Sequence, residues 1–317
     1  MTMLSIARRL VPKSLRPMIR SWLSAWSPRR KLQNMLAPSM LEVVCVDVGA
    51  SYYAHPPWSL FRASPKTHWI AVEPNEQNLG YTQPWQHPCE LRICKTGLSQ
   101  FGGPQTLYVT NVDSGSSLLE PVVPESQKHR FTNLGYFFPL RPRVIETITL
   151  LQAIPEQWQY LPTLVKLDTQ GTELSILKGA HHLLASHNVI GVELEATMLA
   201  QPVMSGGGKF WQACGHLEEL GFELLRIKPI EGGSCFGLLK SKGHRYLNEC
   251  DAVFAVRADV AASLSLAHRT ALLGFYVAYE LHEEAYSLIE RDAALASSLS
   301  AGGCNVAGVQ KLLRTLA

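Results

Sequence analysis

The sequence predicts an α/β protein built on a mostly parallel sheet, and two observations carry this prediction. First, short apolar runs such as 42–47 lack the polar alternation of a half-exposed strand and end in an acid and a Gly-Ala-Ser turn. Strands that crossover helices bury on both faces have this continuous pattern. Second, a helical pattern at 172–186 separates two such runs, 163–168 and 189–195. Strand, helix and strand at this spacing form a right-handed unit of a parallel sheet.

The other elements follow in chain order. Apolar residues recur with helical spacing at 14–26, which predicts an amphipathic helix with arginines on its other face. Proline and aromatic residues are frequent at 121–143, which indicates an excursion from the sheet that covers a site. Strands are expected at 42–47, 68–73, 90–96, 105–110, 163–168, 189–195, 222–227 and 252–256. We therefore expect a leader at 1–40, a sheet domain at 41–257 and a helical extension at 258–317, broken at 300–305.

Charge is divided unevenly along the chain. With 317 residues, of which 46% are hydrophobic and 17% charged, the chain can bury a sizeable core. The net charge of +3 hides a basic leader, because residues 1–31 hold eight of the 29 lysines and arginines and no acid. The rest of the chain is mildly acidic, which argues against a nucleic-acid-binding body.

Cysteine and hydropathy patterns exclude further classes. The seven cysteines include no CxxC pair, which favours reduced thiols in a cytoplasmic protein over disulfides or a zinc site, and no metal site is expected. No apolar window approaches the about 18 residues of a spanning helix. The N-terminus lacks an unbroken apolar core and a small-residue cleavage site, so it does not resemble a secretory signal.

The first candidate site follows the strand at 42–47. Asp47, Gly49, Ala50 and Ser51 form its turn, and Glu73 closes the next strand 26 residues after Asp47. Such strand ends border the ligand crevice of a doubly wound sheet, where a glycine lets the backbone approach a cofactor. The run is neither a GxGxxG nor a GK[ST] phosphate loop, which favours a nucleoside without a pyrophosphate, S-adenosylmethionine. An ordinary strand-to-helix turn with a surface acid is the alternative.

The second candidate site is the run from Val165 to Ala180, VKLDTQGTELSILKGA. Lys166 and Asp168 point to the same side of a strand, since side chains alternate. The Asp168 carboxylate needs a partner, and either Lys166 or the cofactor's amino group could provide one. Glu173 falls in the first turn of the following helix, where helix capping and a functional role are both open.

This second run resembles the hallmark segment of the FkbM-type methyltransferases. VCVDVGAS, which ends at Ser51, is similar to their first motif, and WIAVEPNEQN at 69–78 to their acidic second motif. SGSSL at 114–118 and IGVELE at 190–195 resemble two further motifs, so the similarity extends from about residue 41 to 257. The resemblance implies a Rossmann-like class I methyltransferase sheet of about seven strands. It also implies S-adenosylmethionine as cofactor and O-methylation of a sugar or natural-product hydroxyl.

The resemblance also assigns residues to the cofactor. Glu73 is expected to hold the ribose, Gly97 and Leu98 to lie near the adenine, and the insertion at 111–143 to cover the acceptor with Tyr136, Phe137 and Phe138. The expected cofactor-binding residues are Asp47, Gly49, Ala50, Ser51, Glu73, Asn75, Gly97 and Leu98. Two positions depart from the family pattern: Tyr53 stands where many members have a second glycine, and Gln170 replaces a commoner acid.

Methyl transfer to a hydroxyl requires alignment of the oxygen with the methyl carbon and a group that accepts the proton. Asp168 is our first candidate for the proton acceptor and His55, in the turn before two prolines, is the second. Glu193 and Glu195 end a neighbouring strand and are further candidates. His181 and His182 are expected on a helix surface.

Other functions remain open at this point. A non-catalytic binding module on the same fold is the alternative function, with Tyr53 as its support, and the missing GxGxxG disfavours a nicotinamide-dependent oxidoreductase. The expected partner is a small-molecule or glycan acceptor and not a nucleic acid. The leader either packs on the protein or contacts an anionic membrane at its inner face. The oligomeric state is left open.

Overall fold

The computed structural model describes residues 28–37, 40, 42–51, 54–75, 86–122, 125, 138–201, 203–230 and 248–317. The chain divides into two compact units, one of residues 41–275 and one of residues 1–40 with 276–317. The expected helix at 14–26, Tyr53, Tyr136 and Phe137 lie outside the described residues. None of the helices that the structure describes has the length and apolar character that a membrane span requires.

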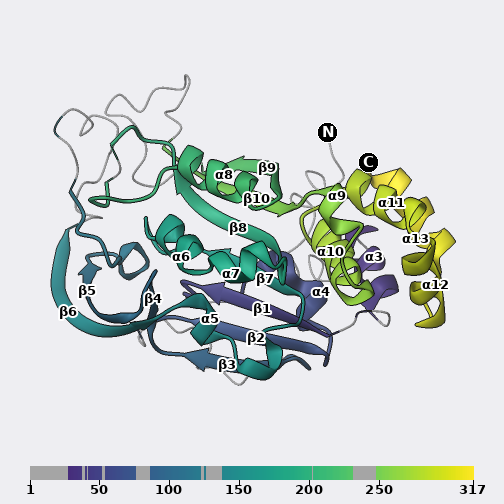
Figure 1. Cartoon of the computed structure of the whole chain (residues 1–317), viewed down its shortest axis with the longest axis horizontal. Helices are drawn as coiled ribbons and strands as arrows, with labels where there is room; N and C mark the ends of the chain where they lie inside the picture. Colours follow the sequence, from purple (N-terminus) through teal and green to yellow (C-terminus); the bar gives the residue numbers. More distant parts are fainter. Residues whose placement is uncertain are drawn as a thin grey trace, which may run out of the picture. The chain divides into compact units, whose positions relative to one another are not determined.

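A seven-stranded sheet forms the centre of the first unit (Figure 1). Its strands, in spatial order, are β3 (Glu90–Cys94), β2 (Thr67–Val72), β1 (Val43–Val48), β7 (Thr163–Leu167), β8 (Val189–Thr197), β10 (Glu249–Val256) and β9 (Phe222–Pro229). The first five run parallel, and β10 is antiparallel to both of its neighbours. This confirms the expected Rossmann-like α/β fold with a mostly parallel sheet of seven strands.

The central strands are buried as their sequences predicted. All six residues of β1 are buried, and β7 and β8 are buried along most of their length. The edge strand β9 is mostly exposed, although its sequence FELLRIKP contains several apolar residues. Because the central parallel strands end at one edge of the sheet, the polar residues that follow them meet there.

The connection between β7 and β8 differs from the single helix expected at 172–186. It consists of α6 (Glu173–Gly179) and α7 (His181–Ala185), with Ala180 outside helical geometry between them. Gly179 lies so close to residue 100 that a Cβ there would come within 2.6 Å of the Gln100 carbonyl oxygen. The helical pattern therefore breaks where the chain packs closely against another segment.

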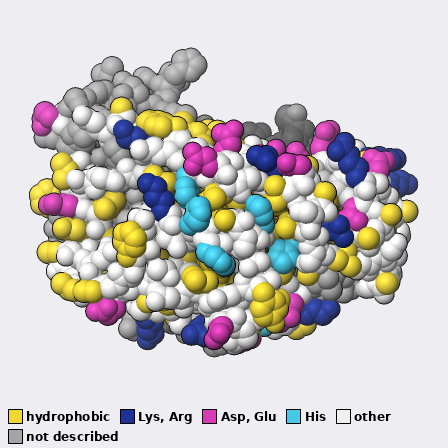
Figure 2. Space-filling model, in the orientation of Figure 1, with side chains coloured by type: hydrophobic (Ala, Val, Ile, Leu, Met, Phe, Trp, Pro, Cys, Tyr) yellow, Lys and Arg dark blue, Asp and Glu magenta, His cyan; other side chains and the backbone are white. Residues whose placement is uncertain are grey.

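Histidines of this connection reach the surface. His181 and His182 of α7 are exposed, as expected. Figure 2 shows histidine side chains gathered near the middle of the presented face, where α6, α7 and α8 (Phe210–Glu219) lie in front of the sheet in Figure 1.

A second, three-stranded sheet branches from the carboxyl end of β3. It consists of β4 (Gly97–Leu98), β6 (Pro139–Ile148) and β5 (Gly103–Thr110), in the order β4-β6-β5. The strand at 105–110 was expected, but β6 was not, because its prolines favoured an irregular excursion up to residue 143. The two-residue β4 pairs only with Thr147 and Ile148, so Pro139 and Pro142 lie on an open edge where their missing N–H groups cost no ladder bond.

The remaining helices of the first unit are short or flank the sheet. They are the single-turn helices η3 (Pro56–Trp58), η6 (Asp113–Gly115) and η9 (Glu156–Trp158), with α4 (Ser59–Arg62), α5 (Leu150–Ala153) and α9 (Ala258–Ala261). Helix α10 (Leu266–Ala278) begins in this unit, and its Phe275 ring packs on Gly191 of β8, where a Cβ would come within 2.6 Å of the ring.

The second unit is helical. It contains α3 (Pro28–Leu36), the end of α10, α11 (His282–Arg291), α12 (Ala293–Ala301) and α13 (Val306–Leu316). Asp292 and Asn305 cap α12 and α13 by accepting the backbone N–H groups of Leu295 and Gly308 at 2.9 Å. The expected helical end of the chain and its break near 300–305 are confirmed.

Candidate active site

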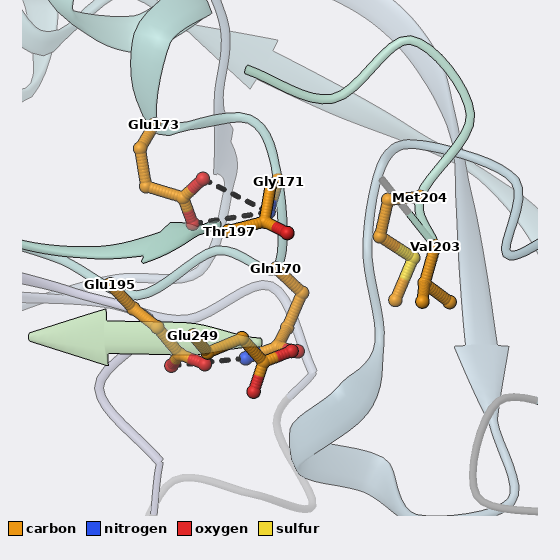
Figure 3. Close-up of a pocket in the computed structure, with 8 residues that line it drawn as sticks. All are labelled: Gln170, Gly171, Glu173, Glu195, Thr197, Val203, Met204 and Glu249. Atoms are coloured by element: carbon orange, nitrogen blue, oxygen red, sulfur yellow. Dashed lines mark hydrogen bonds between the residues drawn. The ribbon is translucent and has the colours of Figure 1, made fainter. Parts of the chain in front are cut away.

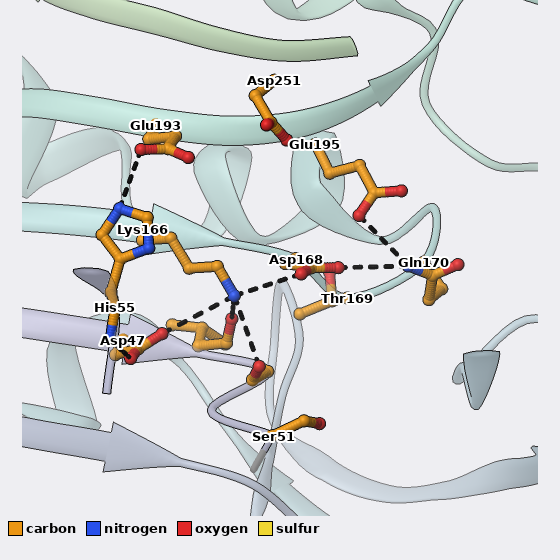
Figure 4. Close-up of polar contacts among 12 residues, drawn as sticks. Asp47, Ser51, His55, Lys166, Asp168, Thr169, Gln170, Glu193, Glu195 and Asp251 are labelled. Carbon is orange, nitrogen blue, oxygen red and sulfur yellow. Dashed lines mark hydrogen bonds and ion pairs between the residues drawn. The ribbon is translucent and has the colours of Figure 1, made fainter. Parts of the chain in front are cut away.

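A cleft of about 590 Å³ opens at the carboxyl edge of the sheet. Small-molecule sites commonly measure roughly 300–1,000 Å³, so the cleft has room for a nucleoside and part of an acceptor. Its described lining comes from β1, β7, β8, β9, β10, the loops that follow them, and η6: Asp47, Gly49, Ser51, His55, Pro56, Pro57, Ser114, Lys166, Leu167, Asp168, Glu193, Glu195, Lys228 and Asp251. Figure 4 shows how the charged members of this set face one another.

The turn after β1 is packed tightly against β7. Gly49 has a φ of +73°, and a Cβ on it would lie 1.9 Å from the backbone oxygen of Asp168. The Gly49 and Ala50 N–H groups both donate to the Val72 carbonyl of β2, at 2.9 and 3.1 Å. Only glycine combines this backbone conformation with this approach. The turn is thereby fixed to β2 and β7 at once.

The Lys166 ammonium joins the two predicted motifs. It lies 3.2 Å from an Asp168 carboxylate oxygen and 3.6 Å from one of Asp47, and it donates to the Gly49 carbonyl at 3.3 Å. Burial acts to lower the pKa of Lys166, but the charges of Asp168 and Asp47 outweigh it and raise that pKa well above its usual value. The lysine is therefore a permanent cation that neutralises part of the cleft floor.

Asp168 is engaged on both carboxylate oxygens. Besides Lys166, it accepts a hydrogen bond from Gln170 Nε2 at 3.1 Å and is hydrogen-bonded to Glu195. Removal from bulk water acts to raise its pKa, yet Lys166 and these hydrogen bonds leave the pKa of Asp168 below its ordinary value. Asp168 is thus an ionised, weakly basic carboxylate.

His55 and Glu193 form a buried pair on the other wall. The imidazole Nε2 lies 2.9 Å from a Glu193 carboxylate oxygen, with the two side chains 9% and 11% exposed. The ring edge of His55 meets Trp58 at 5.0 Å between centroids and an interplanar angle of 82°. The His55 N–H donates to the Asp47 carboxylate at 3.3 Å. A residue from the first motif and one from β8 are thereby brought together.

A small side pocket of about 30 Å³ adjoins the cleft (Figure 3). Val203 and Met204 line one side, and the carboxylates of Glu195 and Glu249 line the other. Burial, then the charge of Asp168, raise the pKa of Glu195 well above its usual value, and the same causes raise the pKa of Glu249 to about 7. Both shifts favour the protonated form of these acids.

Glu173, whose role the sequence left open, folds back onto its own turn. Its carboxylate accepts the backbone N–H groups of Thr169 at 2.8 Å and Gly171 at 2.9 Å. Gln170, at the apex of this turn, has a positive φ of 55°. The structure therefore gives Glu173 a structural contact in the loop that carries Gln170.

The remaining expected cofactor residues, Ala50, Glu73, Asn75, Gly97 and Leu98, are not among the residues that line the cleft. Glu73 accepts from Ser51 Oγ at 3.2 Å and from the Asn75 N–H at 2.7 Å, and burial raises its pKa. Gly97 and Leu98 form β4 and are buried in the second sheet. Ala50 is buried beneath the Gly49 turn. The expected contacts of these residues with a cofactor stay predictions.

Several residues that line the cleft were not predicted from the sequence. Lys228 and Asp251 form a 2.9 Å ion pair at the rim, from β9 and β10. No motif predicts this ion pair, because antiparallel strands bring together residues that are not related by any local spacing. Within the described ranges, no three His, Cys, Asp or Glu side chains are arranged to hold a metal ion.

The parallel sheet, the glycine turn and the acid that follows β2 are features of a Rossmann-like domain. A family profile described as "Methyltransferase FkbM domain" matches residues 47–224, more than half of the chain. The chain belongs to the FkbM methyltransferase domain family. It is therefore a methyltransferase, and the family implies S-adenosylmethionine as the methyl donor.

Solved structures that resemble the chain are also methyltransferases, with low TM-scores and low sequence identities. Precorrin-6y C5,15-methyltransferase from Geobacter metallireducens GS-15 has a TM-score of 0.30 and 14% identity over 72% of this chain and 88% of that one. An "antibiotic related methyltransferase" has a TM-score of 0.31 and 12% identity over 72% and 93%. Likenesses of this size carry no argument about function. A search of the curated proteins gave no match.

Proposed function

We propose that the protein transfers the methyl group of S-adenosylmethionine to a hydroxyl of a sugar, glycan or natural-product acceptor. The observation that carries the proposal is the composition of one cleft. It joins a glycine turn suited to a nucleoside with groups able to accept a proton, Asp168 and His55. Family membership supplies the methyl transfer, and the cleft supports the choice of oxygen as the atom that receives it.

The residues present fit the methyl donor. Glu73 presents a carboxylate at the end of β2, and carboxylates accept hydrogen bonds from vicinal hydroxyls such as those of a ribose. Asp47 and Asp168 outnumber Lys166 beside the Gly49 turn, and the negative charge that remains favours a cationic sulfonium. S-adenosylmethionine supplies an electrophilic methyl group, which the protein aligns with the acceptor while it excludes water.

The acceptor class follows from the lining. A hydroxyl loses its proton as it attacks, so its methylation benefits from a base within hydrogen-bond reach. Five acids and two lysines line the cleft, and acids readily accept hydrogen bonds from neutral hydroxyls. The same excess of acids repels a phosphodiester backbone, which supports a small-molecule or glycan partner over a nucleic acid.

Titration with S-adenosylhomocysteine tests the cofactor. We expect binding in the micromolar range by calorimetry; no heat at millimolar ligand would favour the alternative of a non-catalytic module. Methyl transfer is then measured with radiolabelled S-adenosylmethionine, methyl glycosides of common hexoses and matched amino-sugar glycosides. Label in the hydroxyl-only glycosides supports O-methylation, and label confined to the amino sugars contradicts it.

The leader and the location of the protein stay proposals. Cytoplasmic location with peripheral membrane contact through residues 1–31 is consistent with their charge. Co-sedimentation of the full chain with phosphatidylserine vesicles, compared with a chain that lacks 1–31, tests the contact. Equal sedimentation of the two chains would contradict it.

A further inference from the structure

We propose that His55, oriented by Glu193, is the base that removes the proton from the acceptor hydroxyl. This inference rests on the proposed O-methyl transfer and replaces our first candidate for the base, Asp168. It makes His55 a catalytic residue and Glu193 a positioning residue.

The contacts of Asp168 argue against it as the base. Its carboxylate is held by Lys166 at 3.2 Å and by Gln170 at 3.1 Å, one contact on each oxygen. A carboxylate in this arrangement gains little by taking a further proton, because protonation breaks a charge-assisted contact with Lys166. Asp168 therefore acts as an anchor for Lys166 and the turn.

The backbone of His55 is fixed on both sides. Its N–H donates to Asp47 at 3.3 Å, and its carbonyl oxygen accepts from Arg62 Nη1 at 3.0 Å. The same guanidinium nitrogen also donates to the Ala54 carbonyl at 2.9 Å. Two prolines follow, of which Pro56 restricts the backbone of His55. A loop histidine with so many constraints has the preorganisation that a catalytic group needs.

Glu193 determines which ring nitrogen carries the proton. An ionised carboxylate accepts and cannot donate, so the 2.9 Å contact places a proton on His55 Nε2 and leaves Nδ1 as the basic nitrogen. In Figure 4 one ring nitrogen of His55 faces Glu193, and the second nitrogen is turned away from Glu193. A base oriented by a carboxylate is the arrangement that activates hydroxyls in other enzymes.

The methyl transfer needs no reactant other than S-adenosylmethionine and the acceptor. The acceptor oxygen forms a bond to the methyl carbon, the carbon–sulfur bond breaks, and its electron pair remains on sulfur. The hydroxyl proton passes to Nδ1, and the imidazolium is stabilised by Glu193 until it releases a proton to water. Besides Glu193, the charged groups that line the surrounding cleft are Asp47 of β1, Lys166 of β7, Asp168 directly after β7, Glu195 of β8, and the Lys228–Asp251 pair of β9 and β10.

The first experiment requires no acceptor. The imidazole nitrogens of ¹⁵N-histidine-labelled full-length protein are observed by long-range ¹H–¹⁵N NMR, and His55 is assigned from the signal lost in His55→Gln. We expect neutral His55 to be protonated at Nε2, and Glu193→Gln to weaken this preference. Protonation at Nδ1 in the wild-type protein would overturn the proposal, whatever the result of the S-adenosylhomocysteine titration.

The second experiment measures methyl transfer to the glycoside that the wild type accepts. His55→Gln keeps a donor for Glu193 but removes the base, and we expect kcat to fall about 10²–10⁴-fold. Affinity for S-adenosylhomocysteine should stay within about threefold, which separates loss of the base from loss of the fold. Imidazole added to His55→Ala should restore part of the rate.

The matched control is His68→Gln. His68 is also paired with carboxylates, Glu42 at 2.7 Å and Glu90 at 3.1 Å, but it lies at the opposite end of β2 from Glu73. We expect its kcat to be that of the wild type. Equal losses in both variants, or a His55→Gln enzyme of full activity, would overturn the assignment. A loss of activity in Asp168→Asn that imidazole does not relieve agrees with an anchoring role.

Discussion

The two halves of the cleft differ in how their charges are balanced. On the β1–β7 side, Lys166 lies between Asp47 and Asp168 and also binds the Gly49 carbonyl. On the β8–β10 side, Glu195 and Glu249 line the small side pocket, and their pKa values are raised by burial and by the charge of Asp168. The first half is tightly packed and partly neutralised, and in the second half the protonated form of two acids is favoured.

This difference indicates that the two halves of the cleft have separate roles. A tightly packed, partly neutralised turn needs little reorganisation when a ligand binds. It therefore suits the cofactor, which is the same compound in every turnover. Carboxyl groups that can gain or lose protons suit the side where an acceptor arrives and a proton leaves. The following predictions test the comparison in order of decreasing effect.

Replacement of Lys166 should have the largest effect on stability. Lys166→Met leaves two carboxylates at the cleft floor without their cation, and we expect the free energy of unfolding to fall by about 3–5 kcal/mol. Because the pKa of Asp168 is lowered by this lysine, its stabilising contribution is present above the unfolded-state pKa and lost as pH falls. The difference in the free energy of unfolding between the wild type and Lys166→Met, measured by urea unfolding, should therefore become smaller towards acidic pH.

Lys228→Met is the matched control on the other half. Lys228 also forms an ion pair, with Asp251 at 2.9 Å, but its side chain is 66% exposed. Exposed pairs contribute about 0–1 kcal/mol, so this variant should unfold close to the wild type. Equal losses in the two lysine variants would show that the halves do not differ in rigidity.

Gly49→Ala should come next. The added Cβ meets the Asp168 backbone oxygen and occupies a positive φ, so we expect a loss of about 2–4 kcal/mol and no measurable binding of S-adenosylhomocysteine. Gly103→Ala is its control, since Gly103 has a φ of +88° with nothing within 4 Å of a Cβ. It should lose only about 1 kcal/mol and keep its affinity. Retained binding in Gly49→Ala would contradict a preorganised turn.

Glu73→Ala should affect binding more than stability. We expect affinity for S-adenosylhomocysteine to fall about 10–100-fold by calorimetry, as for other hydrogen bonds to charged groups. Glu90→Ala removes an exposed carboxylate from the neighbouring strand and should bind as the wild type does. Unchanged binding in Glu73→Ala would show that the ribose lies elsewhere.

The smallest effect is expected for replacement of Glu249, on the β8–β10 side. The pKa of Glu249 is raised to about 7 by burial and then by the charge of Asp168, so the stability linked to its protonated form is lost as pH rises through 7. Glu249→Gln should raise the free energy of unfolding by about 1–2 kcal/mol at pH 8 and by less at pH 4.5. Glu223→Gln, on the exposed face of β9, should show no such pH dependence, and a similar curve for both variants would contradict the assignment.

Strands were predicted well where burial alone specifies them. The continuous apolar runs of β1 and β7 reflect burial on both faces, a property that is visible in the sequence. Strand β6 was missed because its prolines are compatible with pairing only when the neighbouring strand is as short as β4. The break at Ala180 was missed because it falls beside the close contact of Gly179 with Gln100, which no local pattern records.

The sequence by itself determined the sheet, the family motifs and the two ends of β1 and β7 that carry Asp47 and Asp168. Their side-chain direction follows from strand alternation, which is a local property. Only the tertiary structure decided that Asp168 is held by Lys166 and Gln170, and that His55 lies 2.9 Å from Glu193, 138 residues away. Such pairings depend on strand order and register, so the identity of the base could be inferred only once the fold had brought these residues together.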